Sequence, residues 1–346
     1  MVVIDCERMR YPNTGLYTFC KELSMAMVRL YGMDNNKIGF YVPAGMEGMY
    51  GRDLYYRRRY PLDKLWLPHS KHYDLWHCTF QLSRYFPSRT KKIITVHDLN
   101  FLYEKTGDKQ LKYIKRLQGI IDKFDRIVAI SEFTRRDLLA NIDVRGKDVD
   151  VVYNGCNIYE GKLVEPAVMP RAPFIFTVGT VVKKKNFHVL PCLLAGNDFE
   201  LLIAGIRSGY EQQIMDEARR WGVADRVKVL GPVDEAVKHW YLANCLAFAF
   251  PSVAEGFGLP VIEAMAYGKP VFLSDHTCLP EIGGDMAYYF NHDFDPEAMQ
   301  REFASGLDDY AGGGKRPEDI KAYARGFTWD KAAKEYSAIY AEMLRR

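Results

Sequence analysis

The sequence contains few cysteines, and their spacing matches neither a metal cage nor a disulfide framework. Seven of the 346 residues are cysteine, and they are scattered along the chain without a Cys-x-x-Cys pair. A structural zinc site needs ligands at short, regular spacings, and a disulfide framework needs an even set of partners. We therefore expect neither, and the composition fits a protein of the reducing cytoplasm.

Long apolar runs are also missing. No stretch approaches the roughly 18 apolar residues that a membrane-spanning helix requires. The start of the chain, Met1 to Asp5, lacks the basic beginning and long apolar core of a signal peptide and predicts a first β-strand instead. With 48% hydrophobic and 26% charged residues, the composition is that of a soluble globular protein. The length of 346 residues exceeds one ordinary core and predicts two domains.

The net charge of +3 is small and the sequence has no nucleic-acid recognition motif, so a nucleic-acid-binding function is not indicated. The charge is, however, unevenly distributed along the chain. Residues 1–170 hold 27 Lys and Arg against 20 Asp and Glu, whereas the remainder holds 20 against 24. A basic first half allows contact with an anionic membrane at its inner face or with a phosphorylated acceptor. The densest basic cluster is Arg57-Arg58-Arg59, for which a solvated loop is the alternative interpretation.

Strands and helices alternate through the first half of the chain, a pattern typical of a doubly wound parallel sheet. Residues 43–72 predict a loop with many aromatic residues and arginines. The expected strands lie at 2–5, 38–42, 73–78, 92–96, 125–130 and 149–153, and the helices at 16–30, 108–123 and 132–141.

A second alternating region follows a segment with three prolines at 160–173, which predicts an inter-domain linker. The sequence therefore predicts a second α/β domain of the same kind. Its expected strands lie at 174–178, 201–204, 227–230, 246–250 and 271–274, its helices at 209–221, 235–244 and after Pro260, and a last helix ends at Arg346.

The most informative stretch runs from Pro251 to Pro270. It follows an apolar strand, and Gly256 and Gly258 leave its loop without Cβ atoms, so a ligand can approach the backbone. Pro260 stands where a first helical residue is expected. The free N–H groups and the positive dipole end of such a helix form a seat for phosphate.

Two carboxylates bracket this loop: Glu255 precedes the glycines, and Glu263 lies one turn into the helix. This spacing resembles the E-x7-E signature of retaining glycosyltransferases of family 4, and the resemblance extends through Glu-Gly-Phe-Gly-Leu-Pro-Val-Ile-Glu-Ala-Met-Ala. The resemblance covers nearly the whole chain and is densest from 174 to 290. It implies a GT-B fold, in which two Rossmann-like domains, 1–165 and 174–326, face each other across a cleft, and the C-terminal helix 327–346 packs back on the first domain.

The resemblance implies that the second domain binds a nucleotide-sugar donor. Glu263 would accept hydrogen bonds from the ribose hydroxyls, because an ionised carboxylate is an acceptor. Glu255 would hold sugar hydroxyls near the reacting carbon as an electrostatic rather than a covalent group. The backbone N–H groups that would bind the diphosphate and the sugar belong to Gly256, Phe257, Gly258 and Leu259.

Further donor contacts are implied around the strand at 174–178. Lys185 matches the family's basic residue on the donor diphosphate and Lys184 is a weaker second, whereas three consecutive lysines otherwise indicate a solvated face. Many members carry an arginine where this chain has Thr180, which offers one hydrogen bond but no charge. Val233 would place its backbone beside the nucleobase.

Two candidates lie in the first domain. His97 follows the strand at 92–96, at the edge where open α/β sheets bind ligands. The resemblance implies that it faces the donor sugar, with Asp98 orienting it or capping the next segment; a structural histidine is the alternative. Gly15 is what remains of the family's glycine-rich turn near the donor phosphate and the acceptor, and an ordinary helix-starting turn is its alternative.

The implied reaction moves a hexosyl unit to a glycan or lipid-linked saccharide with retention of the anomeric configuration, with Glu255, His97 and Lys185 as catalytic residues. GDP-mannose is the first expected donor and a UDP-sugar the second. No Asp-x-Asp motif follows an expected strand, so we expect no divalent metal and no other cofactor. A nucleotide-sugar epimerase or hydrolase of the same fold, or a non-catalytic nucleotide-sugar-binding module, are the alternatives.

Overall fold

The computed structural model describes residues 1–12, 14–68 and 70–345. The chain forms two compact units: Met1–Gly155 with Thr328–Arg346 make the first, and Cys156–Phe327 the second. Residues 156–173, most of which we expected to form a linker, belong to the second unit. Their backbone is bound there, because Arg171 N donates to Glu200 Oε2 at 2.9 Å and Tyr241 Oη donates to the Val168 carbonyl at 2.7 Å.

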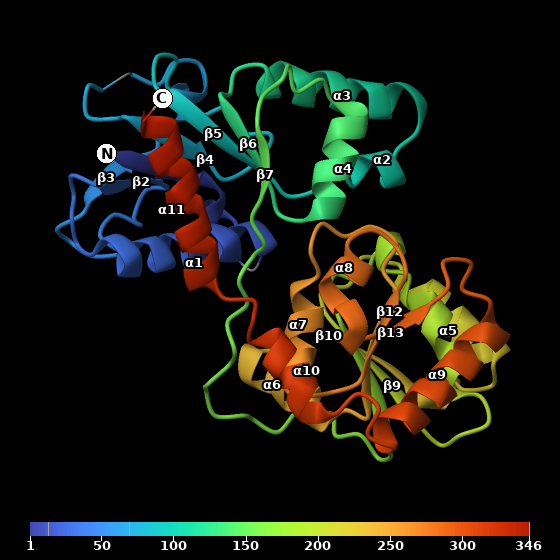
Figure 1. Cartoon of the computed structure of the whole chain (residues 1–346). Helices are drawn as coiled ribbons and strands as arrows, with labels where there is room; N and C mark the ends of the chain where they lie inside the picture. Colours follow the sequence, from blue (N-terminus) through green and yellow to red (C-terminus); the bar gives the residue numbers. More distant parts are fainter. Residues whose placement is uncertain (13, 69, 346) are drawn as a thin grey trace. The chain divides into compact units, whose positions relative to one another are not determined.

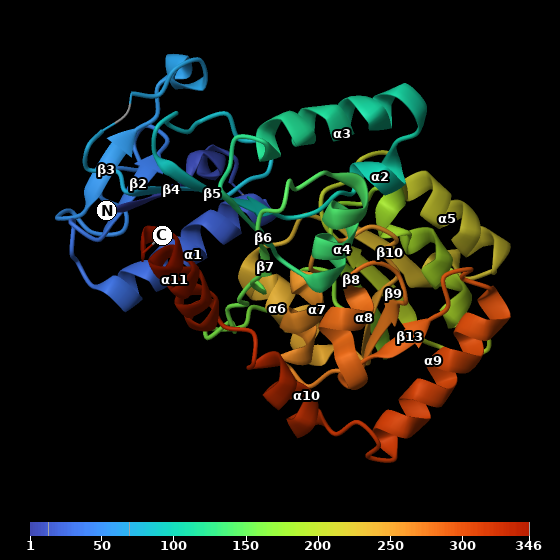
Figure 2. The ribbon, with the colours of Figure 1, turned by 45° about the horizontal axis from the view of Figure 1, so that its top comes forward.

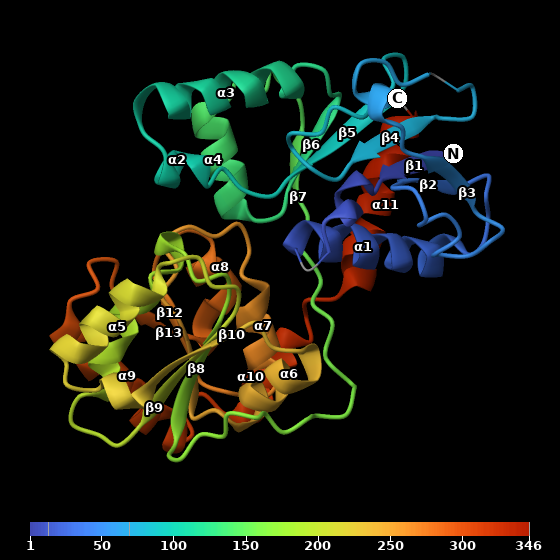
Figure 3. The same ribbon diagram turned by 180° about the vertical axis from the view of Figure 1, so that it is seen from behind.

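Among the described residues, the first unit contains a seven-stranded parallel sheet in the order β3-β2-β1-β4-β5-β6-β7 (Figures 1 and 3). The order reverses between β1 and β4, which is the topological switch point of a doubly wound sheet. The strands are β1 (Val2–Asp5), β2 (Ile38–Val42), β3 (Tyr55–Arg58), β4 (Leu75–Cys78), β5 (Lys91–Val96), β6 (Arg126–Ala129) and β7 (Val149–Val151). The helices are η1 (Glu7–Arg10), α1 (Gly15–Tyr31), η2 (Pro61–Lys64), α2 (Phe101–Glu104), α3 (Gly107–Ile121), α4 (Glu132–Asn141) and α11 (Trp329–Arg345).

Helices cover both faces of this sheet. Successive side chains of a strand point to opposite faces, so each strand contributes to the core on both sides. On β4 and β5, Trp76 and Ile94 join the apolar core that includes Leu117 of α3. The neighbouring residues point the other way: His77 contacts Tyr340 Oη at 2.6 Å, and Thr95 contacts Tyr336 Oη at 2.8 Å, both on α11. The last helix of the sequence is therefore part of the first unit's core, where it lies beside α1 (Figure 2).

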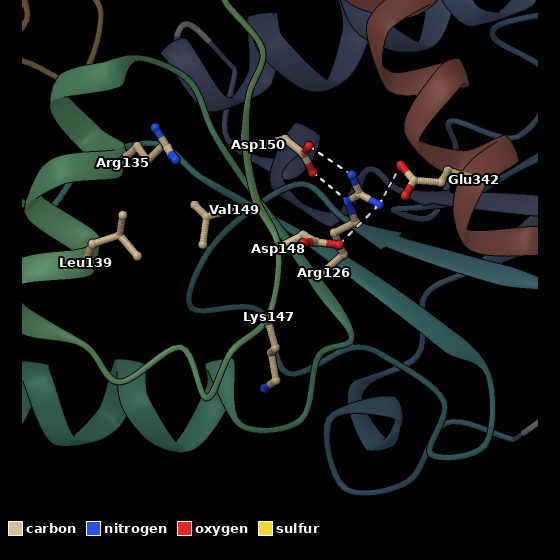
Figure 4. A pocket seen from close by; sticks show the side chains of 8 residues that line it. All are labelled: Arg126, Arg135, Leu139, Lys147, Asp148, Val149, Asp150 and Glu342. Carbon is tan, nitrogen blue, oxygen red and sulfur yellow. Dashed lines mark hydrogen bonds and ion pairs between the residues drawn. The ribbon is translucent and has the colours of Figure 1, made fainter. Parts of the chain in front are cut away.

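A charged network also fixes α11 to the sheet (Figure 4). Arg126 of β6 donates to Asp150 at 2.6 and 2.9 Å and pairs with Glu342 of α11 at 2.8 Å. These residues line a cavity of about 390 Å³. One buried guanidinium thus connects the end of the chain to two strands.

The prediction of a loop over 43–72 is wrong in part, because this segment contains β3 and η2. Arg57 pairs with Asp63 at 3.3 Å, and Arg59 Nη2 donates to Tyr85 Oη at 2.8 Å, whereas the side chain of Arg58 is 53% exposed. The Arg57-Arg58-Arg59 cluster is therefore a strand and its continuation with two of its three arginines held by internal partners, not a solvated loop.

The second unit contains, in the part of the chain that is described, a six-stranded parallel sheet in the order β10-β9-β8-β11-β12-β13. Its order reverses between β8 and β11. The strands are β8 (Phe174–Val178), β9 (Glu200–Ala204), β10 (Val227–Gly231), β11 (Ala247–Phe250), β12 (Val271–Ser274) and β13 (Tyr288–Phe290). The helices are η3 (Lys183–Lys185), η4 (Phe187–Leu194), α5 (Glu211–Arg220), η5 (Ala224–Arg226), α6 (Glu235–Asn244), α7 (Leu259–Met265), α8 (Leu279–Gly283), η6 (Gly284–Met286), α9 (Pro296–Ala311) and α10 (Pro317–Ala324).

The described helices do not include one that is both long and apolar enough to span a bilayer.

Candidate active site

The loops after β8 and β11 meet at the switch point of the second unit. Lys185 ends the short helix η3 after β8, and Glu255 lies in the loop after β11. The Lys185 ammonium lies 2.5 Å from Glu255 Oε1, and the two side chains are only 13% and 14% exposed. Ser252 Oγ also donates to Glu255 Oε1 at 2.6 Å. Two residues predicted from the sequence as catalytic are therefore in direct, partly buried contact.

Lys184 contributes to the same place through its backbone. Its carbonyl accepts a hydrogen bond from Val253 N at 2.9 Å and lies 3.1 Å from Ser252 Oγ, whose single proton it shares with Glu255. These bonds join the loop after β8 to the loop after β11, and they set the position from which the next residue, Lys185, reaches Glu255. The Lys185 ammonium also lies 4.6 Å from the centre of the Phe250 ring, a cation–π distance.

The predicted glycine-rich loop requires glycine at Gly258. This residue has a φ of +98°, and an added Cβ would lie 3.0 Å from Leu279 Cδ2. The thiol of Cys278 lies 3.4 Å from the Glu255 carbonyl and 3.3 Å from that of Phe257. The loop is thus fixed on one side by α8, and the helix α7 that follows begins at Leu259.

Glu263 of α7 is held by a lysine that sequence reasoning missed. Lys238 Nζ donates to Glu263 Oε1 at 3.0 Å and lies 2.9 Å from Glu235 Oε2. Burial by itself lowers the pKa of Lys238, but the charges of Glu263 and Glu235 outweigh burial and raise it. Lys238 is therefore a cation, and it fixes the carboxylate that we expect to contact the ribose.

A potential metal-binding group lies around this lysine. Glu235, His239 and Glu263 each place one ligand atom within 4.8 Å of the others. Hydrogen bonding by His239, followed by the interaction with Lys238, lowers the pKa of Glu235 to about 2, so this carboxylate is ionised. Because the Lys238 ammonium already contacts both carboxylates, a divalent cation here would meet its repulsion.

The remaining predicted donor contacts lie on loops of the same sheet edge. Thr180 is exposed after β8, and Val233 is half-buried after β10. Beside it, Gly231 has a φ of +82°, and Arg207 donates to the Val229 carbonyl at 2.5 Å. Arg207 therefore lies beside the loop that we expect to contact the nucleobase. Like Lys238, it is a cation that was not predicted from the sequence.

His97 lies in the first unit, at the carboxyl end of β5. Its Nε2–H donates to the Thr79 carbonyl at 2.7 Å, and Phe19 packs edge-on against the ring at 4.6 Å. Burial lowers the pKa of His97 to about 4, so the imidazole is neutral at neutral pH with Nδ1 as its acceptor. Asp98 Oδ1 accepts from Asn100 N at 3.1 Å, in the turn before α2, and this bond does not cap the helix, so the role of Asp98 stays a prediction.

Gly15 begins α1, in the first unit. Thr14 caps this helix by accepting from Tyr17 N at 3.2 Å, and a Cβ on Gly15 would meet no atom of the described residues within 4 Å. Locally this is an ordinary helix start, which is the alternative that the sequence left open, and none of the described residues of this unit requires a glycine there.

Comparison with known proteins identifies the family. The profile described as Glycosyl transferases group 1 matches residues 165–327, and that of Glycosyltransferase Family 4 matches residues 27–159. O-antigen chain mannosyltransferase B of Escherichia coli is 24% identical over 284 residues, which cover 74% of this chain and 72% of the relative.

A second relative is also a glycosyltransferase by name, and a solved structure has a similar fold. The N-acetylgalactosamine-N,N'-diacetylbacillosaminyl-diphospho-undecaprenol 4-alpha-N-acetylgalactosaminyltransferase of Campylobacter jejuni is 26% identical over 199 residues, covering 56% of this chain but only 54% of that relative. The structure of sucrose-phosphate synthase from Thermosynechococcus elongatus matches with a TM-score of 0.76 and 17% identity over 99% of both chains.

The two parallel-sheet units and these matches define a protein of the GT-B glycosyltransferase class, which confirms the predicted fold. The two glycosyltransferase profiles, over residues 27–159 and 165–327, confirm the predicted resemblance to glycosyltransferase family 4.

The neutral state of His97 can be tested by NMR. Its pKa in the folded protein, about 4, lies below the usual 6.5, so it contributes stability above pH 6.5 that is lost as the pH falls toward 4. We expect the ring signals to keep the chemical shifts of neutral imidazole down to about pH 5. The His97→Gln variant identifies the signals, and free histidine in the same tube provides the reference. An inflection near pH 6.5 would contradict a buried neutral ring.

Proposed function

We propose that this protein transfers a hexosyl unit from a nucleotide-diphosphate sugar to a glycan or lipid-linked saccharide. The contact between Lys185 and Glu255, at the carboxyl ends of β8 and β11, is the observation that supports this function. In this proposal the Lys185 ammonium binds the leaving diphosphate and the Glu255 carboxylate beside it binds the sugar hydroxyls. Both lie on the sheet edge where α/β proteins bind nucleotides.

The second unit would bind the donor through separate contacts to its ribose, its diphosphate and its sugar. Glu263, fixed by Lys238, would accept hydrogen bonds from the ribose hydroxyls. The Lys185 ammonium has three N–H donors, so it can bind a phosphate oxygen as well as Glu255. The backbone N–H groups from Gly256 to Leu259 would bind the remaining diphosphate and sugar oxygens.

The bond between the anomeric carbon and the diphosphate would break as the acceptor hydroxyl attacks from the same face, and the leaving phosphate would take the acceptor proton. Lys185 would stabilise the charge that develops on the diphosphate. Glu255 would act by position and charge, without a covalent glycosyl intermediate. The anomeric configuration would then be retained, and no divalent cation would be needed.

The proposed donor is GDP-mannose, with UDP-sugars second. The relative from Escherichia coli is named as a mannosyltransferase, and the relative from Campylobacter jejuni is named for an acceptor on diphospho-undecaprenol. A cytoplasmic enzyme that extends a lipid-linked saccharide is consistent with both names.

The donor and the absence of a metal can be tested by thermal shift. We expect one nucleotide class, among GDP, UDP, ADP and their sugar conjugates, to raise the melting temperature, with the same shift in EDTA. Glu263→Ala should abolish most of the shift, whereas Glu297→Ala, at an 83% exposed side chain of the same unit, should leave it unchanged. No shift with any nucleotide would rule out this donor site, and a shift lost in EDTA would rule out the metal-free site.

The stereochemical outcome can be read by NMR once the donor is known. We expect wild type to form a product with the donor's anomeric configuration. Glu255→Gln should lose about 10²-fold or more in kcat, because the carboxylate that positions the sugar is gone. A glycosyl–enzyme adduct seen by mass spectrometry, or an inverted product, would contradict the assigned role of Glu255.

We also propose that the first unit contacts an anionic membrane, at a place other than the Arg57-Arg58-Arg59 cluster. A groove of about 790 Å³ is lined by six basic side chains against Asp63, counted over the described residues. Beside it, Leu62, Leu65 and Trp66 are 72%, 77% and 70% exposed. Exposed apolar and aromatic side chains next to cations are typical of an interfacial membrane contact. The six basic residues are Lys64, Arg84, Lys92, Lys115, Arg116 and Lys123.

Vesicle sedimentation tests this contact. We expect the protein to sediment with vesicles that contain phosphatidylglycerol and not with pure phosphatidylcholine. Trp66→Ser should weaken binding, because it removes an exposed ring from the contact. The pair Lys115→Glu, Arg116→Glu should weaken binding by about 30-fold or more, since each lost basic residue near the surface contributes about 1 kcal/mol and 1.4 kcal/mol corresponds to about tenfold. The pair Lys331→Glu, Lys334→Glu gives the same charge change on α11 and should have little effect. Equal losses in both pairs would contradict a local contact.

A further inference from the structure

A cluster of arginines lies at the carboxyl end of β1 in the first unit. Arg8, Arg10 and Arg59, here called the arginine cluster, surround the carboxylate of Glu7, whose side chain is 6% exposed. Their Nε atoms lie 3.7, 3.1 and 3.5 Å from the nearest Glu7 oxygen. Within the described chain, three positive charges thus share one buried negative charge.

The hydrogen-bonding capacity of the arginine cluster is largely unused. A guanidinium has five N–H donors. Arg59 donates to Tyr85 Oη at 2.8 Å and Arg10 donates to Tyr11 Oη, whereas the guanidinium of Arg8 makes no hydrogen bond to the described residues. The Nε atoms of Arg8 and Arg59 are buried without a hydrogen-bond acceptor in the described part. These buried Nε groups lie 3.7 and 3.5 Å from Glu7, so a ligand would bind the other N–H groups of the cluster, whose side chains are 26%, 36% and 20% exposed.

Aromatic rings hold these guanidinium groups in place. Arg8 lies 3.8 Å from the centre of the Phe80 ring, Arg10 lies 4.4 Å from that of Tyr11, and Arg59 lies 5.0 Å from that of Tyr85. Cation–π contacts fix the planes of the guanidiniums before a ligand arrives. Fixed, planar donors match the oxygen atoms of a phosphate better than flexible lysines do.

Neighbouring acidic groups do not cancel the excess charge. Asp63 is paired with Arg57 at 3.3 Å, and Glu47 lies 3.9 Å from Arg58. Asp5 is buried and accepts from Glu7 N and Ser83 Oγ, and burial raises its pKa to about 7. The net charge around Glu7 is therefore positive at neutral pH.

The position of the arginine cluster connects it to the reaction edge of the first unit. Arg8 follows β1 and Phe80 follows β4, the two strands between which the sheet order reverses. This is the place where doubly wound sheets bind ligands. After burial, the charge of Arg8 is one of the causes that lower the pKa of His97, so the two side chains lie within electrostatic reach.

We propose that the arginine cluster binds a phosphate ester of the acceptor, so that the acceptor is a phosphorylated saccharide. The inference rests on the proposed glycosyl transfer and names the chemical class of its second substrate. A phosphate monoester carries a charge of about −1.5 to −2, close to the excess positive charge that Glu7 and the partly ionised Asp5 leave in the cluster. The single charge of a uronic acid carboxylate would balance less of this excess.

Ligand-observed NMR titration tests the proposal with glucose 1-phosphate, glucose and glucuronate as probes. A saturating nucleoside diphosphate fills the site at Lys185, so that the probes report on the first unit alone. We expect glucose 1-phosphate to bind at least about tenfold more tightly than either other probe, as charge-assisted hydrogen bonds predict. Arg8→Gln should weaken this binding about tenfold, Arg8→Lys less, and Arg58→Gln, a matched loss of charge beside the cluster, less than about twofold.

Each other result overturns the proposal. Equal binding of glucose and glucose 1-phosphate would show that no phosphate site exists, and tighter binding of glucuronate would replace the phosphate by a carboxylate. Equal losses of glucose 1-phosphate affinity in Arg8→Gln and Arg58→Gln would show that only the overall positive charge attracts the probe, without a specific phosphate site. The nucleotide thermal shift of the same samples separates the two hypotheses: if it persists while probe binding fails, only the acceptor assignment falls.

Discussion

Parallel strand pairing is the constraint on which both units depend. All the described strands of a sheet run in the same direction, so their carboxyl ends lie at one edge. Because each pair of parallel strands is joined by a crossover connection, residues that are far apart in the sequence meet at this edge. In the second unit this brings Lys185, after β8, to 2.5 Å from Glu255, after β11. In the first unit it brings Arg8, after β1, to 3.8 Å from the ring of Phe80, after β4. The two clusters of functional interest are consequences of the same topology.

Local patterns in the sequence predict much of this fold. Short apolar runs locate the central strands, and Gly258 with Pro260 locates the start of α7, because buried strands and helix starts depend on neighbouring residues. Edge elements are harder. In β3, Tyr55-Tyr56-Arg57-Arg58 has no buried run, because an edge strand packs on one side and Arg57 is compensated by Asp63. The proline-rich segment 156–173 likewise depends on partners in α6 and β9 that its own composition does not encode.

Some residues of the candidate site can likewise be predicted from the sequence, and others cannot. Glu255 and Glu263 are recognised because the motif around them is continuous in sequence. Lys238 is not, because it stands three residues after Glu235 on α6 and resembles an ordinary solvated helix pair. Its contact with Glu263 exists only once α6 and α7 pack together. Gly15 shows the reverse case, since a Cβ on this glycine, which matches the family's turn, would meet none of the described residues within 4 Å.

The two clusters hold positive charge in different ways, and the difference bears on how a reaction would proceed. Lys185 is matched one to one by Glu255, so a partly buried ammonium is compensated before any ligand binds. Under the proposed function, the ammonium would bind the diphosphate while keeping its contact with Glu255, so that the carboxylate is already held in position to accept from the sugar hydroxyls. The arginine cluster has no such internal match, because Glu7 compensates one charge of three among the described residues. Its excess charge favours a counter-charge from outside the protein, and under our proposal a phosphorylated substrate would supply it.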